Sequence, residues 1–314
     1  MKISIVIPIY DEEESISTLL SEIKEAIDPH FDDYEIIAVN DGSKDGSMEV
    51  LRVEALKNSK IKVVNFRRNF GQTAAMAAGF DLATGEVIIP LDADLQNDPK
   101  DIILLVEKLN EGFDIVSGWR KDRQDKLVSR KIPSWIANYI ISRVTGVNLH
   151  DYGCTMKAYR RDILQDIRLY GEMHRFIPAL AAWNGANITE IVTHHRERKF
   201  GKTKYGISRI FRVILDLFTV KFLLKYSAKP MHFFGKAGIY LLIGGFISGL
   251  IAVFLRIFLG MSFIITPLPL LTVFLMLMGV QFILMGLIFE ILIRTYYESQ
   301  DKRPYAIKEK INLS

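Results

Sequence analysis

Residues 87–109, VIIPLDADLQNDPKDIILLVEKL, contain the pattern that decides the fold. An apolar run from Val87 to Leu91 ends in a polar segment, and residues 101–109 then place apolar positions at helical spacing. A short run that is apolar throughout is typical of a strand buried on both faces of a sheet, since a half-exposed strand alternates between apolar and polar residues. This stretch therefore predicts a strand, a polar turn and a helix in succession.

The same unit recurs over the first 120 residues. Apolar runs at 3–9, 34–39, 62–66, 87–91 and 114–117 alternate with helical patterns at 15–26, 47–56, 73–83 and 101–109. Such alternation predicts an α/β fold with a mostly parallel sheet flanked by helices. Ligands bind beyond the carboxyl ends of the strands in these sheets, and polar or glycine-rich residues follow each expected strand at that edge. We therefore expect the binding site there.

Composition limits the classes of protein to consider. The 314 residues suffice for one large domain or two ordinary ones, and the net charge of +4 is too mild to favour a nucleic-acid partner. The single cysteine, Cys154, excludes a disulfide within the chain and a cysteine-based metal site. The first apolar run is only about eight residues long and ends in acids, so it is interpreted as a buried strand rather than a signal peptide.

Two long apolar spans, residues 237–255 and 268–289, predict a hairpin of membrane-crossing helices, because each has the roughly 20 residues needed to cross a bilayer. The preceding residues 207–226 are both basic and strongly apolar, which is typical of a helix lying in the headgroup region. Residues 132–144 also have an amphipathic pattern, which fits either a helix packed on the sheet or a helix on the membrane surface.

Basic residues flank the two spans, whereas the loop between them carries only Arg256. By the positive-inside rule, both termini and the α/β domain are expected to be cytoplasmic, in a two-span protein of the inner (plasma) membrane. The expected parts are an α/β domain at 1–206, an amphipathic juxtamembrane segment at 207–235, two transmembrane helices at 236–293 and a cytoplasmic tail at 294–314.

Asp92 and Asp94 stand one residue apart where the fourth expected strand ends. Two carboxylates in this position can hold one hard divalent cation and leave coordination positions for phosphate oxygens and water, and Gln96 adds a neutral oxygen on the same side. A solvated turn would explain the same residues, because turns are rich in aspartate. Asp41, at the end of the second expected strand, either caps a helix or accepts hydrogen bonds from a base or ribose.

Five segments carry a resemblance to a known family. They are ISIVIPIYDEEESI (3–16), VNDGSKDGS (39–47), RNFGQTAAMAAGF (68–80), LDADLQNDP (91–99) and HDYGCTMKAYRRD (150–162). In this order they resemble the inverting GT-A glycosyltransferases of family 2, and within it the polyprenyl-phosphate glycosyltransferases of the dolichyl-phosphate mannose synthase and bacterial undecaprenyl-phosphate glucosyltransferase type. The resemblance extends over nearly the whole chain, because the two apolar spans also match the bacterial membrane-anchored branch. It implies a GT-A catalytic domain at 1–206.

The resemblance also implies roles for individual residues. The metal site, for Mg²⁺ or Mn²⁺ bridging a nucleotide diphosphate, would comprise Asp92, Asp94 and Gln96. The nucleotide pocket would comprise Pro8, Tyr10, Glu12, Asp41 and Asp92. The acceptor phosphate would bind Arg120, Arg130 and Ser134. The candidate catalytic residues would be Asp94, Asp151 and Arg198, the last in a loop that closes over both substrates. For Asp151, a base or positioning role and a purely structural role in a turn both remain open.

The implied reaction is inverting transfer of one sugar from a nucleotide sugar to undecaprenyl phosphate at the cytoplasmic membrane face. The bacterial resemblance favours UDP-glucose and leaves UDP-N-acetylglucosamine, UDP-aminoarabinose and GDP-mannose open. It also implies a homo-oligomer, with a tetramer suspected. A processive polysaccharide synthase would carry a Gln-x-x-Arg-Trp motif, which does not occur here. A catalytically silent membrane-anchored binding module is the other alternative, and the intact acids and arginines argue against it.

Overall fold

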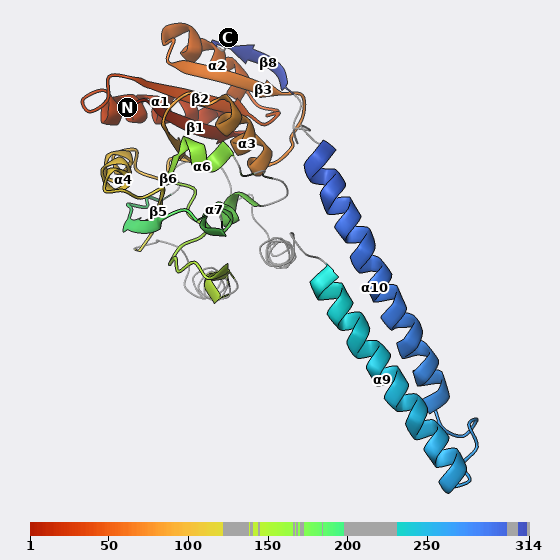
Figure 1. Cartoon of the computed structure of the whole chain (residues 1–314). Coiled ribbons are helices and arrows are strands. Elements are labelled where there is room, and N and C mark those ends of the chain that lie inside the picture. The colour runs from red at the N-terminus through yellow and green to blue at the C-terminus, as the bar shows by residue number, and fades with distance from the viewer. Residues whose placement is uncertain are drawn as a thin grey trace. The chain divides into compact units, whose positions relative to one another are not determined.

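The computed structural model describes residues 1–121, 138, 141–143, 145–165, 167, 169, 173–183, 185–197, 231–299 and 307–312. The chain divides into two compact units (Figure 1). One comprises residues 1–220 with 303–314, and the other comprises residues 221–302. The first unit contains the sheet and the second contains two long helices.

The first unit is built on an eight-stranded sheet with the order β7-β5-β6-β4-β1-β2-β3-β8. Its strands are β1 Ile3–Ile9, β2 Tyr34–Asn40, β3 Ile61–Phe66, β4 Val87–Pro90, β5 Ile115–Trp119, β6 Lys157–Arg160, β7 Ile188–Val192 and β8 Ile307–Ile311. Neighbouring strands run parallel except where β6 pairs with β4 and β5 and where β8 pairs with β3. The predicted mostly parallel sheet is thus confirmed.

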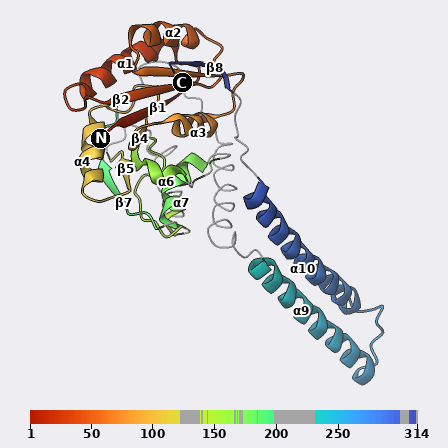
Figure 2. The ribbon, with the colours of Figure 1, turned by 45° about the horizontal axis from the view of Figure 1, so that its top comes forward.

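Helices cover both faces of this sheet (Figure 2). They are α1 Glu13–Ile27, α2 Ser47–Lys57, α3 Gln72–Leu82 and α4 Asp101–Asn110, followed by the short α6 Arg161–Gln165, η2 Met173–Phe176 and α7 Ile177–Trp183. On one face, Ile5 and Ile7 belong to the core cluster that α1, α2 and α4 complete. On the other face, α3 packs so closely that a Cβ on Gly79 would overlap the side chain of Val6. Burial on both faces explains why these strands read as continuous apolar runs.

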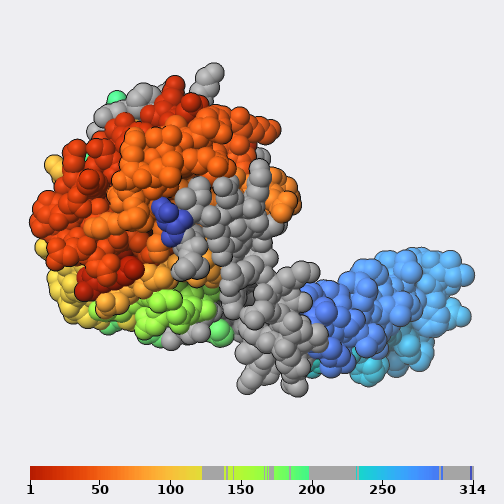
Figure 3. Space-filling view, turned by 90° about the horizontal axis from the view of Figure 1, so that it is seen from above, coloured from red at the N-terminus to blue at the C-terminus, as the bar shows by residue number. Residues whose placement is uncertain are grey.

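The first five strands and four helices lie within two residues of their predicted bounds. The expected tail is different, because α10 (Leu268–Ser299) continues beyond residue 293 and residues 307–311 form β8 beside β3. Asn312 adds hydrogen bonds from its side-chain amide to the carbonyl oxygens of Ala55 at 3.2 Å and Ile61 at 2.9 Å. In Figure 3, blue atoms of this C-terminal segment lie among the orange atoms of the N-terminal part of the unit. Residues beyond the hairpin therefore complete the sheet.

The second unit is a pair of helices, α9 (Met231–Phe258) and α10. Within them, Phe233–Phe258 and Leu268–Phe289 are long and apolar enough to cross a membrane, with only 22% and 11% of the apolar window buried. The helices approach closely at two glycines, because a Cβ on Gly238 would lie 2.7 Å from the Gly279 carbonyl oxygen and a Cβ on Gly279 would lie 2.9 Å from that of Gly238. Small residues at a contact are typical of helix pairs in membranes.

The two predicted amphipathic segments fall largely outside the described residues. Residues 207–226 lie wholly outside them, and of 132–144 only Asn138 and residues 141–143 are described. There, the Asn138 amide donates to the His150 carbonyl oxygen at 2.7 Å, and the Ser142 hydroxyl donates to that of Leu149 at 3.4 Å. The polar side of this segment thus faces residues 149–150.

Candidate active site

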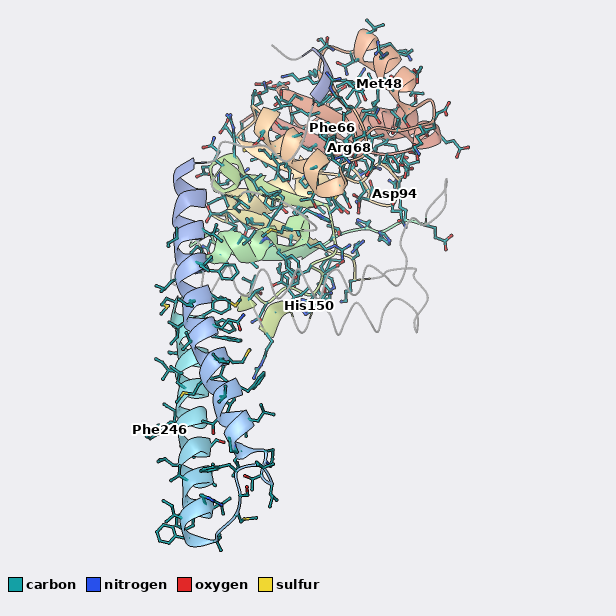
Figure 4. The ribbon with its side chains drawn as sticks, turned by 90° about the vertical axis from the view of Figure 1, so that its right-hand side faces the viewer. Met48, Phe66, Arg68, Asp94, His150 and Phe246 are labelled. Carbon is teal, nitrogen blue, oxygen red and sulfur yellow. The ribbon has the colours of Figure 1, made fainter. Side chains whose placement is uncertain are left out.

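The paired carboxylates follow β4 at the carboxyl end of the sheet, as predicted. Gln72, the first residue of α3, donates from Nε2 to Oδ1 of Asp92 at 2.8 Å. The Gln96 backbone N–H donates to Oδ1 of Asp94 at 3.2 Å. Leu95 has a φ of 61° in the left-handed region, which is costly for a bulky residue and is typically kept at functional sites. Figure 4 labels Asp94 on this loop.

The electrostatics around Asp92 would favour a bound cation. Burial, and after it the charge of Asp94, raise the pKa of Asp92 to about 6, although a hydrogen bond with Thr155 and the charges of Arg120 and Lys157 act in the opposite direction. Two partly buried carboxylates repel each other, and a bound divalent ion would compensate this repulsion.

The donor set fits Mg²⁺ or Mn²⁺ bound together with a nucleotide diphosphate. Asp92 and Asp94 offer carboxylate oxygens, and no cluster of three or more His, Cys, Asp or Glu side chains suited to a metal occurs in the described part of the chain. Such hard ions commonly take one or two carboxylates and complete their coordination with phosphate oxygens and water. Gln96 lies on the same loop, but its Nε2 is directed to the carbonyl oxygen of Arg196 at 3.4 Å.

The loops after β1 and β2, which carry the predicted nucleotide residues, are interlocked by side chains that accept backbone N–H groups. Oδ1 of Asp11 accepts from Lys44 at 2.7 Å, and Oε2 of Glu13 accepts from Gly46 at 2.9 Å. In return, the Glu12 N–H donates to Oγ of Ser47 at 3.0 Å. These contacts hold the loops together at the edge of the sheet, next to the ends of their strands.

Of the other predicted nucleotide residues, Pro8 lies within β1, opposite Val39 of β2, and Tyr10 directly follows β1. Both therefore lie near the same edge of the sheet. Tyr10 and Glu12 each have further interactions within the protein.

Asp41 fixes the start of α3 rather than capping α2. Its Oδ1 accepts the Phe70 N–H at 2.7 Å and its Oδ2 accepts the Gly71 N–H at 2.9 Å. Burial raises the pKa of Asp41, although these two hydrogen bonds oppose the rise. Gly42 makes this contact possible, because its φ is 67° and a Cβ there would overlap the Arg68 backbone. Each carboxylate oxygen keeps a second lone pair that could accept a hydrogen bond from a nucleoside. That contact remains a prediction.

Arg120 and Asp151, which were predicted for different roles, form one bidentate ion pair. Arg120 donates from Nε to Oδ2 at 2.7 Å and from Nη2 to Oδ1 at 3.0 Å, and the Gly153 N–H donates to Oδ1 at 3.0 Å. Burial alone would lower the pKa of Arg120, but the charge of Asp151 raises it above its ordinary value. Asp151 is 4% exposed, so this pair is held in place rather than solvated. The guanidinium is therefore permanently charged beside the carboxylate loop.

Trp119 and His150, the residues that precede Arg120 and Asp151, also contact each other. The rings of Trp119 and His150 stack with centroids 4.2 Å apart and an angle of 16° between their planes. Glu190 of β7 accepts the His150 N–H at 2.9 Å and also contacts its Nδ1. Figure 4 labels His150. The pattern of the sequence assigned no role to these rings.

Three predicted site residues, Arg130, Ser134 and Arg198, lie outside the described residues. The described segment before Arg198 lies beside the carboxylate loop, because the Arg196 N–H donates to the Gln96 carbonyl oxygen at 2.8 Å. Arg196 also pairs with Glu22 at 2.6 Å and Asp98 at 2.7 Å. The chain thus enters the predicted closing loop next to the acids.

Sequence reasoning missed three residues that the structure links to Asp92, namely Gln72, Thr155 and Lys157. Gln72 could have been found, because it directly precedes the predicted helix of residues 73–83, in the loop that follows a predicted strand. Lys157 is the first residue of β6, and Thr155 lies just before it. This strand is antiparallel and is inserted between β4 and β5. A four-residue strand gives too short a pattern to reveal which strands it joins.

Comparisons with known proteins identify the family of the chain. Residues 4–168, just over half of the chain, match the Glycosyl transferase family 2 domain. The chain is 43% identical over 316 residues to dodecaprenyl-phosphate galacturonate synthase of Rhizobium johnstonii, covering 98% of this chain and 93% of that protein. It is 38% identical over 312 residues to undecaprenyl-phosphate 4-deoxy-4-formamido-L-arabinose transferase of Salmonella choleraesuis, covering 99% and 94%.

Among solved structures, the chain is similar to glucosyl-3-phosphoglycerate synthase from Mycobacterium tuberculosis in complex with Mn²⁺, UDP and phosphoglyceric acid. The TM-score is 0.53 at 16% identity, covering 71% of this chain and 78% of that chain. This likeness supports the GT-A fold, and the two relatives confirm the resemblance to polyprenyl-phosphate glycosyltransferases. The chain is a glycosyltransferase and belongs to glycosyl transferase family 2.

Proposed function

We propose that this protein transfers a single sugar from a nucleotide sugar to a polyprenyl phosphate at a membrane surface, with inversion at the anomeric carbon. The proposal depends on one observation above all: the same chain combines paired carboxylates at the carboxyl end of a GT-A sheet with two helices long enough to cross a membrane. A lipid phosphate lies at the membrane surface, so an enzyme that uses it has to be held there. Both relatives named above act on a dodecaprenyl or undecaprenyl phosphate, by their names.

The described residues suit this reaction. Asp92 and Asp94 would hold Mg²⁺ or Mn²⁺, which when bound stabilises the negative charge that develops on the leaving diphosphate. Arg120 has N–H groups beyond those that bind Asp151, and these are available to a phosphate oxygen.

A strong general base is not required. A phosphate monoester has a second pKa near 6, so the lipid phosphate is largely dianionic at neutral pH and is already a nucleophile. Asp151 is bound bidentately by Arg120 and by the Gly153 N–H. We therefore assign Asp151 the role of positioning Arg120 rather than that of removing a proton.

The donor we propose is nucleotide-linked galacturonic acid, the sugar in the name of the 43% identical relative. The 38% identical relative is named for a formamido-arabinose. UDP-glucose, expected from the bacterial resemblance, is not confirmed by either name.

The membrane arrangement we propose has two crossings, with the sheet on the cytoplasmic side of the inner membrane. β3 precedes the helical hairpin in the chain and β8 follows it, yet both strands pair in one sheet. The segment between them must therefore cross the membrane an even number of times. The positive-inside pattern supports the cytoplasmic side for the sheet. A homo-oligomer remains a prediction, which mass photometry of the detergent-solubilised protein would check.

The test is transfer by the purified full-length protein in detergent, followed by mass spectrometry of the lipid product. The donor panel comprises UDP-galacturonic acid, UDP-4-deoxy-4-formamido-arabinose, UDP-glucose, UDP-N-acetylglucosamine and GDP-mannose, each with undecaprenyl phosphate and with Mg²⁺, Mn²⁺ or EDTA. We expect a metal-dependent polyprenyl-phosphate galacturonate. Another single sugar on the lipid would overturn the donor assignment alone, whereas no product from any donor would overturn the function.

A further inference from the structure

Lys157 is a buried lysine to which the reaction described above assigns no step, although its charge lowers the pKa of Asp92. It opens β6, between β4 and β5, and is 2% exposed. Its Nζ donates to the carbonyl oxygen of Tyr152 at 3.4 Å and to that of Cys154. It forms no ion pair with any carboxylate of the described residues.

An ammonium group in this position is costly. Lysine is almost never fully buried unless it is paired, because removal of its charge from water is strongly unfavourable. Burial accordingly lowers the pKa of Lys157, and the charges of Cys154 and Asp151 oppose this only in part. A methionine would fill nearly the same volume without that cost, so packing alone does not account for a lysine.

The two carbonyl groups that Lys157 binds belong to the turn that carries Asp151. Tyr152 and Cys154 flank Gly153, whose N–H donates to Oδ1 of Asp151 at 3.0 Å. That carboxylate in turn holds Arg120 through two hydrogen bonds. Hydrogen bonds, joined by the covalent backbone of the turn, thus connect the buried ammonium to the guanidinium.

We propose that Lys157 is a positioning residue for sugar transfer: its ammonium fixes the turn of residues 151–154, and the turn fixes Asp151 and Arg120. The inference rests on the proposed function, because it assigns Lys157 to the same site. Lys157 is too buried to touch a substrate, so it acts through the turn. The alternative is that Lys157 only supports the fold. The positioning role and the purely structural role make different predictions for the kcat and KM of a Lys157 variant.

The test compares Lys157→Met with Lys62→Met in the full-length protein. Lys62 pairs with Glu35 at 2.5 Å near the opposite end of the strands, so this control loses an ammonium on the same sheet far from the site. For Lys157→Met we expect kcat to fall about 10- to 100-fold, as is typical when catalytic groups are misplaced, while the KM for the donor stays within about threefold. Lys62→Met should keep the kcat of the folded protein.

A second readout does not require activity. Hydrogen exchange of a peptide spanning residues 150–156 should become faster in Lys157→Met and remain unchanged in Lys62→Met, because only the first loses the bonds to the turn. If Lys157→Met does not fold, Lys157→Gln takes its place. Its amide keeps two N–H donors, but the shorter side chain lacks the ammonium charge, so kcat and exchange should change in the same directions.

Unchanged kcat and unchanged exchange in the folded Lys157 variant would overturn the proposal. An equal fall of kcat in Lys62→Met would also overturn it, because the effect would then follow general destabilisation. If the wild-type protein itself transfers no sugar, the proposed function fails, and the exchange measurement still decides whether Lys157 holds the turn.

Discussion

Replacing Glu35 by glutamine should remove a pH-dependent part of the stability of the sheet. Glu35 accepts hydrogen bonds on Oε1 from the Ser4 hydroxyl at 2.5 Å and the Thr84 N–H at 2.6 Å, and Lys62 contacts Oε2 at 2.5 Å. Burial alone would raise its pKa, but these partners lower it from 4.5 to about 2. At about 1.4 kcal/mol per pKa unit, the lowered pKa of Glu35 corresponds to about 3 kcal/mol of folding stability at neutral pH.

The direction of the pH dependence of stability follows from the lowered pKa of Glu35 in the folded protein. The unfolded chain takes up a proton at Glu35 near pH 4.5, whereas the folded protein does so only near pH 2. The stabilisation is thus complete above the unfolded value and is lost as the pH falls towards the folded one, so about 2 kcal/mol should disappear between about pH 7 and pH 3. The free energy of unfolding, from urea titration followed by tryptophan fluorescence, measures this for the wild type and Glu35→Gln.

The difference between the two proteins should therefore be large at neutral pH and shrink towards pH 3. Glu54→Gln is the matched control, because Glu54 pairs at 2.9 Å with Lys57, whose side chain is 61% exposed. Removal of such a surface pair should cost less than about 1 kcal/mol. A wild-type–Glu35→Gln difference that stays constant with pH would refute the reasoning.

Three further changes have defined outcomes. Asp94→Ala should abolish metal-dependent transfer in the lipid-product assay, because the cation would lose one of its two carboxylates; surviving activity that EDTA still inhibits would contradict the metal assignment. Arg130→Ala should chiefly raise the KM for the lipid phosphate, and an unchanged KM would remove Arg130 from the acceptor site. Gly279→Ala should destabilise the helix pair by about 1–3 kcal/mol, since its Cβ would meet the Leu242 side chain at 2.7 Å. Gly244→Ala is the control and should be tolerated, because a Cβ there has only one neighbour, at 3.8 Å. Thermal unfolding in detergent measures both variants.

The β-strand and helix succession of the first 120 residues could be predicted because each strand is buried on both faces and each helix follows directly. That local regularity also fixes the edge at which Asp92 must lie, since parallel strands end together. The pairing of Asp151 with Arg120 could not be found in this way. It depends on β6 running antiparallel between β4 and β5, which brings residues 31 positions apart into contact.

Short strands late in the chain account for most of what was missed. β6 has four residues and β7 and β8 have five each, so their patterns are too brief to identify a partner strand. Residues 307–311 read IKEKI, which is as compatible with a solvated basic segment as with a strand. Likewise, Lys157 looks like any surface lysine until the strands on either side of it are known.

The pairing of β8 with β3 has a consequence for biosynthesis. While the chain emerges from the ribosome, β3 is an edge strand with unpaired backbone groups, and its partner is made only after both long helices. An open edge of this kind is a template for aggregation. The sheet therefore closes only after the hairpin has been synthesised, so a failure of membrane insertion would leave the catalytic unit with an exposed edge that quality-control proteases and chaperones can recognise.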